Sequence, residues 1–162
     1  MTPLAKAKGL ALLVPLALLG GAYGFQYVWG HLSPCEMCWW QRYAHFAALP
    51  FAVAALLAGQ RLNGGRIFVW LAALAIFVSG AIAFYHAGVE LKIFPGLTQC
   101  TASVSGTADE MLQAVLAGPM VRCDDVQWSW LGISMAGWNA IVSILSALAI
   151  LWLSLRKPKA AA

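Results

Sequence analysis

Charged side chains are scarce in this sequence. They make up 10% of its 162 residues, while hydrophobic residues make up 62%, against about 25% and roughly 45–50% in typical soluble domains. A soluble fold of this length has too little interior to hide so many apolar side chains. The scarcity of charge therefore excludes an ordinary soluble domain and favours a protein whose solvent is lipid.

Three other patterns are absent. The apolar runs do not alternate with polar residues, which excludes a transmembrane β-barrel. The net charge is +4, but the bases form no stripe with interleaved aromatic residues, so we expect no nucleic-acid partner. The sequence also shows no internal repeat, low-complexity segment or second, soluble domain.

Four apolar runs are present instead, each near the length of about 20 residues that a helix needs to cross a bilayer. Backbone groups in lipid must be paired within the segment, so these runs are expected to be helices. The sequence thus predicts an all-α integral membrane protein, a four-transmembrane-helix bundle with two periplasmic loops, in a single membrane domain over residues 1–162. The expected helices cover about 9–29, 39–59, 67–85 and 137–155, and the expected loops cover about 30–38 and 87–136.

The first apolar run also has features of a secretory signal peptide, since Lys6 and Lys8 precede it and Gly20 and Gly24 lie near its end. Its apolar stretch continues to Trp29, which is long for a signal peptide. We therefore expect an uncleaved first helix.

Acidic residues are missing from one side of the expected membrane. The bases near both termini and between the second and third helices have no acid among them, and the positive-inside rule puts such segments in the cytoplasm. We therefore expect a multi-pass membrane protein with both termini cytoplasmic and with its two outer loops facing the periplasm or its equivalent. The seven bases are Lys6, Lys8, Arg61, Arg66, Arg156, Lys157 and Lys159, and the six acids of the other side are Glu36, Glu90, Asp109, Glu110, Asp124 and Asp125.

Cysteine is missing from all four apolar runs. Cys35 and Cys38 lie in the first outer loop, and Cys100 and Cys123 lie in the second. An even number of cysteines in an oxidising compartment indicates disulfides. A C-x-x-C pair closes too short a ring to be a good structural staple, so a redox role is favoured. A zinc site made by all four cysteines is the alternative, but zinc sites usually contain two close pairs, and 22 residues separate Cys100 from Cys123.

The surroundings of Cys38 favour redox chemistry. Pro34 stops a helix from extending backward, so the second helix is expected to begin near the C-x-x-C pair. Thiolate is stabilised at a helix N-terminus. Arg42 lies four residues beyond Cys38, on the same helical face. Its guanidinium is expected to favour the Cys38 thiolate and to hold an anionic acceptor, whereas a simple role at the lipid headgroups is the alternative.

The segment PCEMCWWQR at 34–42 resembles the P-C-x-[LM]-C-x-x-Q-R signature of the disulfide bond formation protein B (DsbB) family. The segments YHAGVE at 85–90 and WLGISM at 130–135, the second cysteine pair and Trp138 are also similar, in the same order along the chain. The resemblance implies a thiol:quinone oxidoreductase of the bacterial inner membrane that reoxidises a periplasmic, thioredoxin-fold DsbA-like oxidase. Such an enzyme works between that partner and the quinone pool of the membrane, with ubiquinone or menaquinone as cofactor and no metal.

The same resemblance assigns roles to individual residues. Cys35–Cys38 would be the pair beside the quinone, with Cys38 facing it and Cys35 exchanging with the second loop. Cys100–Cys123 would face the partner, with Cys100 the sulfur attacked. Arg42 and His86 would bind the quinone, whereas a helix-end histidine bonded to a loop carbonyl is the alternative for His86. The spacing of four residues would also let Glu90 pair with His86.

Two other functions remain open at the level of the sequence. A vitamin K epoxide reductase-like enzyme also combines four helices, a C-x-x-C pair and a quinone. A non-enzymatic membrane scaffold stapled by disulfides is the other possibility. In the second loop, Thr107 and Glu110 have the spacing of a capping box, which predicts a short helix that ends at Gly118.

Overall fold

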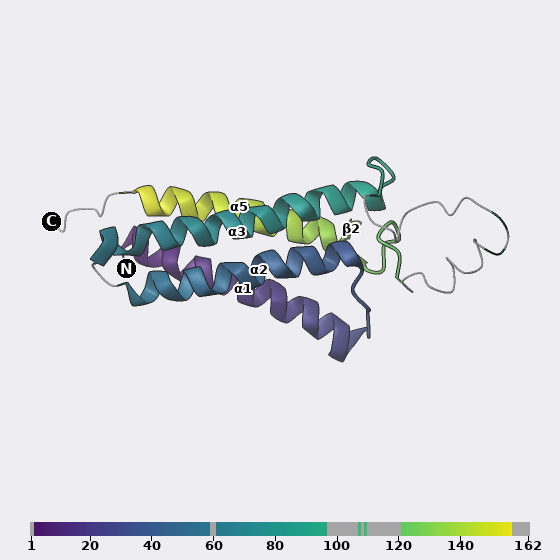
Figure 1. Cartoon of the computed structure of the whole chain (residues 1–162), viewed down its shortest axis with the longest axis horizontal. Coiled ribbons are helices and arrows are strands. Elements are labelled where there is room, and N and C mark those ends of the chain that lie inside the picture. The colour runs from purple at the N-terminus through teal and green to yellow at the C-terminus, as the bar shows by residue number, and fades with distance from the viewer. Residues whose placement is uncertain (1, 59–60, 97–106, 108, 110–120, 157–162) are drawn as a thin grey trace.

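The structure is a computed structural model that describes residues 2–58, 61–96, 107, 109 and 121–156. Within these residues, four long helices pack along one another and form an elongated bundle (Figure 1). A five-residue π-helix, η1 (Phe25–Trp29), continues the first helix. The four helices are α1 (Pro3–Gly24), α2 (Glu36–Leu57), α3 (Arg61–Glu90) and α5 (Met135–Leu155).

Side-chain caps set where three of these helices begin. The Thr2 hydroxyl accepts a hydrogen bond from the backbone N–H of Ala5, and Pro3, which has no N–H to satisfy, opens α1. The Ser134 hydroxyl likewise accepts from the N–H of Gly137 at the start of α5. The cap of α2 is the sulfur of Cys35.

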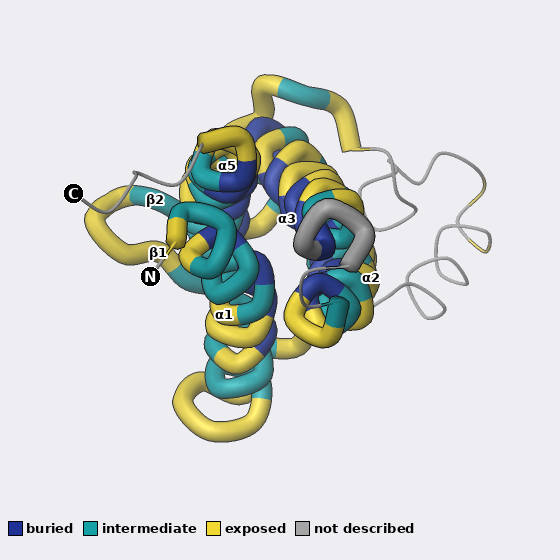
Figure 2. Tube along the Cα trace, turned by 90° about the vertical axis from the view of Figure 1, so that its left-hand side faces the viewer, coloured by how far each residue is buried: buried dark blue, intermediate teal, exposed yellow. Residues whose placement is uncertain are grey.

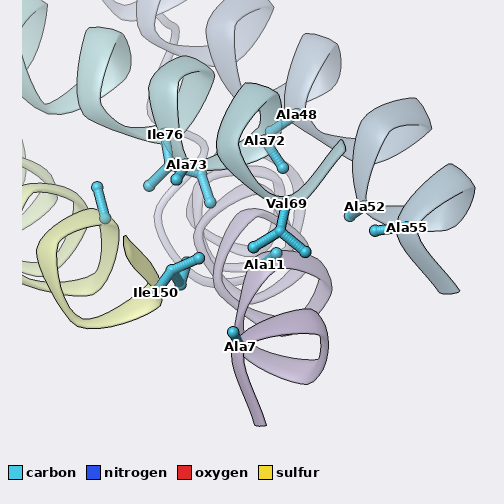
Figure 3. Close-up of a cluster of buried hydrophobic side chains, with 11 residues drawn as sticks. Ala7, Ala11, Ala48, Ala52, Ala55, Val69, Ala72, Ala73, Ile76 and Ile150 are labelled. Carbon is cyan, nitrogen blue, oxygen red and sulfur yellow. The ribbon is translucent and has the colours of Figure 1, made fainter. Parts of the chain in front are cut away.

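The interior of the bundle is built mainly from alanine. Figure 3 shows Ala11, Ala48 and Ala72 near Val69, where α1, α2 and α3 approach one another. Small side chains allow this close approach and are typical of helix contacts in membranes. Large apolar side chains point outward instead, for example Leu57 and Leu145, which are 82% and 61% exposed. Buried residues therefore line the inside of the bundle and exposed residues its outside (Figure 2).

Three helical segments of the described chain are long and apolar enough to cross a membrane: Pro3–Trp29, Gly65–Glu90 and Met135–Leu155. The protein is therefore an all-helical membrane protein. Helix α2 has a similar length, but Gln41, Arg42 and His45 interrupt the apolar character of its first half, and it is not among the three.

A two-residue hairpin precedes α5. Strand β1 (Ser129–Trp130) pairs antiparallel with β2 (Ile133–Ser134), with Trp130 opposite Ile133. The turn residues Leu131 and Gly132 have φ values of 53° and 76°, the left-handed conformation that two-residue hairpin loops require. The hairpin thus places Ser134 at the start of α5, beside the end of α3.

Opposite ends of the bundle carry different chemistry. The start of α1, the end of α2, the start of α3 and the end of α5 lie together at one end (Figure 1). The hairpin, the start of α2 and the end of α3 lie at the other end. Cys100 and most of the short helix predicted from Thr107 and Glu110 lie outside the described residues.

Candidate functional site

The site begins with the Cys35–Cys38 pair at the start of α2. Cys35 has an extended backbone (φ −75°, ψ 172°), and its Sγ accepts a hydrogen bond of 3.3 Å from the backbone N–H of Cys38. This cap brings the two Sγ atoms to 2.7 Å from each other. Cys35 is buried and Cys38 is half-buried. The pair is therefore placed to form or exchange a disulfide.

Cys123 comes from the second loop and joins this pair. It is fully buried, packs with Cys35, Met37 and Val89, and its side chain is hydrogen-bonded to that of Cys35. Cys35 therefore has a sulfur neighbour on each side, one from its own pair and one from the other loop.

An ionic clasp holds the segment around Cys123 against α3. The Lys92 ammonium, just beyond the end of α3, donates to the backbone carbonyl and to Oδ2 of Asp124, both at 2.7 Å. The Arg122 guanidinium donates to both carboxylate oxygens of Asp124 at 2.9 Å. Hydrogen bonds from these two cations lower the pKa of the Asp124 carboxyl well below its usual range. The clasp is therefore charged at any ordinary pH.

The two thiols of the first pair differ as acids, and both precede the apolar segment that begins at Trp39. The pKa of Cys35 is strongly raised, because its sulfur is hydrogen-bonded to Cys123 and Cys38 and is buried. The pKa of the Cys38 thiol is lowered, chiefly by the hydrogen bond from Cys35, and the charge of Arg42 adds to this effect. Of the two thiols in the reduced pair, Cys38 is therefore the one that loses its proton more readily.

His86, near the end of α3, faces the same sulfur atoms. Its Nε2 lies 3.6 Å from Cys35 Sγ, 3.1 Å from the Cys123 carbonyl oxygen and 3.9 Å from a carboxylate oxygen of Glu90. Glu90 in turn accepts a hydrogen bond from Ser134 at the start of α5. The predicted His86–Glu90 pair is thus present, and His86 touches the cysteine cluster directly.

Arg42 is one helical turn beyond Cys38 and is buried, with its guanidinium directed toward α1. It donates to the side-chain oxygen of Gln26 and, at 3.5 Å, to the carbonyl of Ala22. The guanidinium carbon lies 4.8 Å from the ring centre of Tyr23 and 5.0 Å from that of Trp39. These contacts hold a permanent positive charge inside the bundle.

A buried polar layer lies beneath the cysteines, and the sequence reasoning missed most of it. Of its members, only Gln41 was included in the sequence analysis, as part of the PCEMCWWQR segment. Each member is an isolated polar residue within an apolar run, a position that is costly in lipid unless the side chain finds a partner. That signal could have identified the layer, which contains Gln41, His45, Ser79, Asn139 and Ser143.

A cavity of about 290 Å³ opens beside the site. One wall is apolar and comes mainly from α1 and the start of η1, including Leu18, Ala22 and Phe25. The other helices contribute polar groups to the lining, from the start of α2 and from α3 and α5: Cys35, Cys38, Gln41, Arg42, His45, His86, Glu90 and Asn139. A pocket with apolar walls and a few convergent polar groups is typical of a small-molecule site.

The cluster also has atoms that could ligate a soft cation. The Sγ atoms of Cys35 and Cys123 and a ring nitrogen of His86 lie within 4.8 Å of one another, and all three residues are buried. This set differs from the four-cysteine site considered from the sequence. Of the residues predicted for the site, five meet here: Cys35, Cys38, Cys123, Arg42 and His86. The sixth, Cys100, is outside the described residues.

Comparisons with known proteins agree on one family. Residues 6–153 match the family described as Disulfide bond formation protein DsbB. The chain is 31% identical over 154 residues to a protein named Disulfide bond formation protein B from Marinobacter nauticus, covering 92% of this chain and 90% of that protein. A protein of the same name from Azoarcus sp. is 30% identical over 142 residues, covering 85% and 84%. No solved structure gives a significant match.

Proposed function

The chain belongs to the family of disulfide bond formation protein DsbB, and from this premise we propose that it is a thiol:quinone oxidoreductase of the bacterial inner membrane. It reoxidises a periplasmic DsbA-like dithiol oxidase and relays the electrons through Cys100–Cys123 and Cys35–Cys38 to a quinone. The observation that supports this function most is that sulfur atoms from both loops meet beside a cavity with one apolar wall.

The central step of the proposal is an exchange between the two cysteine pairs. After the partner has reduced Cys100–Cys123, the Cys123 thiolate attacks Cys35 of the Cys35–Cys38 disulfide. A Cys123–Cys35 bond forms and the Cys35–Cys38 bond breaks, which releases Cys38 as a thiolate. Attack of Cys100 on Cys123 then restores the Cys100–Cys123 disulfide and leaves Cys35 and Cys38 reduced. The position of Cys35 between two sulfurs and the lowered pKa of Cys38 support this order.

The residues around the cavity fit a quinone. A flat apolar ring suits the wall formed by α1, and its two carbonyl oxygens need hydrogen-bond donors, which the polar lining residues of the other helices carry. A bound quinone would supply the two-electron, two-proton acceptor that returns the Cys35–Cys38 dithiol to a disulfide. Arg42 would hold positive charge beside the Cys38 thiolate and the acceptor, and His86 would place an N–H at the cysteine cluster.

The proposed orientation has four membrane spans, with α2 as the fourth. Lys6, Lys8 and Arg156 belong to one end of the bundle, and Glu90 and Asp124 to the other. A basic end is expected to be cytoplasmic. The polar groups of α2 face the inside of the bundle, since Gln41, Arg42 and His45 are buried, and this makes a span through lipid acceptable.

The partner in this proposal is captured at Cys100. Replacing Cys123 by serine removes the thiol that would resolve a mixed disulfide between Cys100 and the partner. The variant should therefore accumulate a covalent adduct with a thioredoxin-fold protein, visible on non-reducing gels. The double variant Cys100→Ser/Cys123→Ser should form none, and an adduct that persists in it would contradict the assignment of Cys100.

The function is tested with purified protein, a reduced DsbA-like dithiol and a short-chain ubiquinone or menaquinone. We expect loss of quinone absorbance in proportion to dithiol consumed, and no turnover after Cys38→Ser substitution. A disulfide-stapled scaffold would reduce neither quinone, and that result would refute the enzymatic proposal.

A further inference from the structure

The buried polar layer is a continuous chain of hydrogen bonds that leads from the cysteine cluster into the bundle. His86 Nδ1 lies 2.9 Å from Gln41 Nε2, and Gln41 Oε1 accepts from Asn139 Nδ2 at 2.8 Å. Asn139 Oδ1 then lies 3.1 Å from His45 Nε2 and accepts from Ser143 at 2.8 Å. The chain joins two histidines on different helices, with no exposed residue between them.

The cysteine end of this chain fixes the direction of every hydrogen bond in it. The Cys123 carbonyl oxygen can only accept, so the His86 Nε2 that lies 3.1 Å away carries the proton. In a neutral His86, Nδ1 is then the acceptor and Gln41 must donate to it. Gln41 therefore presents its oxygen to Asn139, and Asn139 presents its own oxygen to His45. It follows that His45 Nε2 carries a proton, and a neutral His45 then has a bare lone pair on Nδ1.

This lone pair has no partner within the described part of the chain. His45 is 2% exposed. Among the described residues, its Nδ1 is one of two buried side-chain nitrogen or oxygen atoms that lack a hydrogen bond. An unsatisfied buried acceptor costs about 1–3 kcal/mol, so a ligand that donates to it is favoured. His45 also lines the cavity, next to Arg42 and Asn139.

We propose that His45 is a further binding residue of the acceptor site, whose bare Nδ1 accepts a hydrogen bond from a hydroxyl group of the reduced acceptor, a hydroquinone. The inference rests on the proposed function, because it assigns a ligand contact within the same cavity. A quinone has only acceptor oxygens and cannot donate to Nδ1, whereas a hydroquinone can. His45 therefore selects the product form, and Asn139 and Gln41 act as positioning residues that keep its Nδ1 unprotonated.

Binding of the two acceptor forms tests the proposal. A short-chain benzoquinone is titrated into the protein with Cys35–Cys38 oxidised, and the matching hydroquinone into the reduced protein, so that neither mixture reacts. Quenching of tryptophan fluorescence reports binding. We expect His45→Phe to weaken hydroquinone binding about fivefold, the loss of one hydrogen bond, and to change quinone binding less than about twofold. Ser143→Ala is the matched control, because Ser143 contacts Asn139 and His45 but does not line the cavity.

A second measurement does not depend on the variant folding. The chain has only three histidines, so nitrogen NMR of histidine-labelled wild-type protein can follow each ring. We expect an unprotonated Nδ1 on His45 that shifts when hydroquinone is added. Equal loss of both ligands in His45→Phe, or a protonated Nδ1 in the wild type, would overturn the role of His45 while leaving the oxidoreductase proposal intact. A wild-type protein that binds neither form would refute both.

Discussion

At the scale of single residues, Cys35 combines two tasks that are usually separate. Its sulfur caps α2 and is also the atom that contacts both other sulfurs of the cluster. Because the cap fixes where Cys35 lies, Cys38 falls in the first turn of α2, where N–H groups favour a thiolate. The two cysteines thus form the start of the helix, and they also differ in thiol pKa, which is raised at Cys35 and lowered at Cys38.

Arg42 gives the most direct test at this scale. Arg42→Ala removes a buried positive charge from the cavity wall, and hydrogen bonds to charged groups contribute about 1.5–3 kcal/mol. We therefore expect the apparent KM for quinone to rise by about tenfold or more, while exchange between the two cysteine pairs is largely retained. Arg42→Lys should keep part of the activity, because the charge remains but the planar fork of donors is lost.

The control for Arg42 is Arg156→Ala at the opposite end of the bundle. Arg156 also stacks on an aromatic ring, with its guanidinium carbon 3.6 Å from the ring centre of Trp152. Steady-state kinetics over a quinone titration distinguish the two variants. Wild-type kcat and KM in Arg42→Ala would mean that Arg42 has only a structural role, through its contacts with Gln26 and Tyr23.

At the scale of elements, the clasp between Asp124 and the end of α3 determines whether Cys123 stays buried. Asp124→Asn removes both ion pairs, so we expect maleimide to modify Cys123 several times faster in the reduced variant. Exposed ion pairs contribute only about 0–1 kcal/mol, so the thermal midpoint should change little. Asp125→Asn is the control, because Asp125 is 67% exposed and its carboxylate lies 3.8 Å from Arg122, which is a long and weak ion pair.

The pH dependence of the clasp follows from the lowered pKa of Asp124. A carboxyl whose pKa is lowered by folding contributes stability above its unfolded pKa of about 4, and this contribution is lost as the pH falls through the lowered value. Maleimide modifies Cys123 at one rate in Asp124→Asn and at another in the wild type. The ratio of these two rates should therefore stay constant between about pH 5 and pH 8. A ratio that falls steadily over this range would mean that another group holds the loop.

Contact between α3 and α5 depends on Gly80. A Cβ atom there would lie 2.8 Å from Ile144 Cγ1 and 3.0 Å from Ser143 Cβ, so the helices would have to separate. Gly80→Ala should lower the free energy of unfolding by about 1–3 kcal/mol, the usual effect of overpacking. Gly20→Ala is the control, because nothing lies within 4 Å of a Cβ at that position. Unfolding in mixed detergent measures both, and equal stabilities would contradict this packing.

At the scale of the whole molecule, the packing is the reverse of that in a soluble protein. Alanines fill the interior and large apolar side chains cover the outside (Figures 2 and 3). In lipid this arrangement has no cost, since the large side chains are already in an apolar solvent and the small ones bring the helices close together.

The proposed topology predicts the position of each end. Reporter fusions after residues 60 and 160 should behave as cytoplasmic, and a fusion near residue 105 should behave as exported, because the bases cluster on one side. An exported reporter at residue 160 would mean that the number of spans is odd, for instance because α2 does not cross.

Local patterns revealed much of the fold and part of the site. The apolar runs predicted an all-helical membrane protein, and the PCEMCWWQR segment identified the family, which the match over residues 6–153 confirms. The hairpin before α5 was not predicted, because strands of two residues are too short to show the alternation of apolar and polar residues that indicates a strand. The predicted fourth span stays a prediction, since polar residues in α2 weaken its hydropathy.

The sequence by itself determined that this protein lies in lipid, because its composition is too apolar for water. Neighbouring residues along the chain also determined that the cysteines lie outside the apolar runs and where α2 begins. Only the tertiary structure decided that Cys123 reaches Cys35, that Arg42 turns toward α1, and that Gln41 and Asn139, 98 residues apart, connect the two histidines. Those contacts depend on how each helix is rotated about its axis. The small residues that set the rotation act between helices, so no single segment of the chain encodes it.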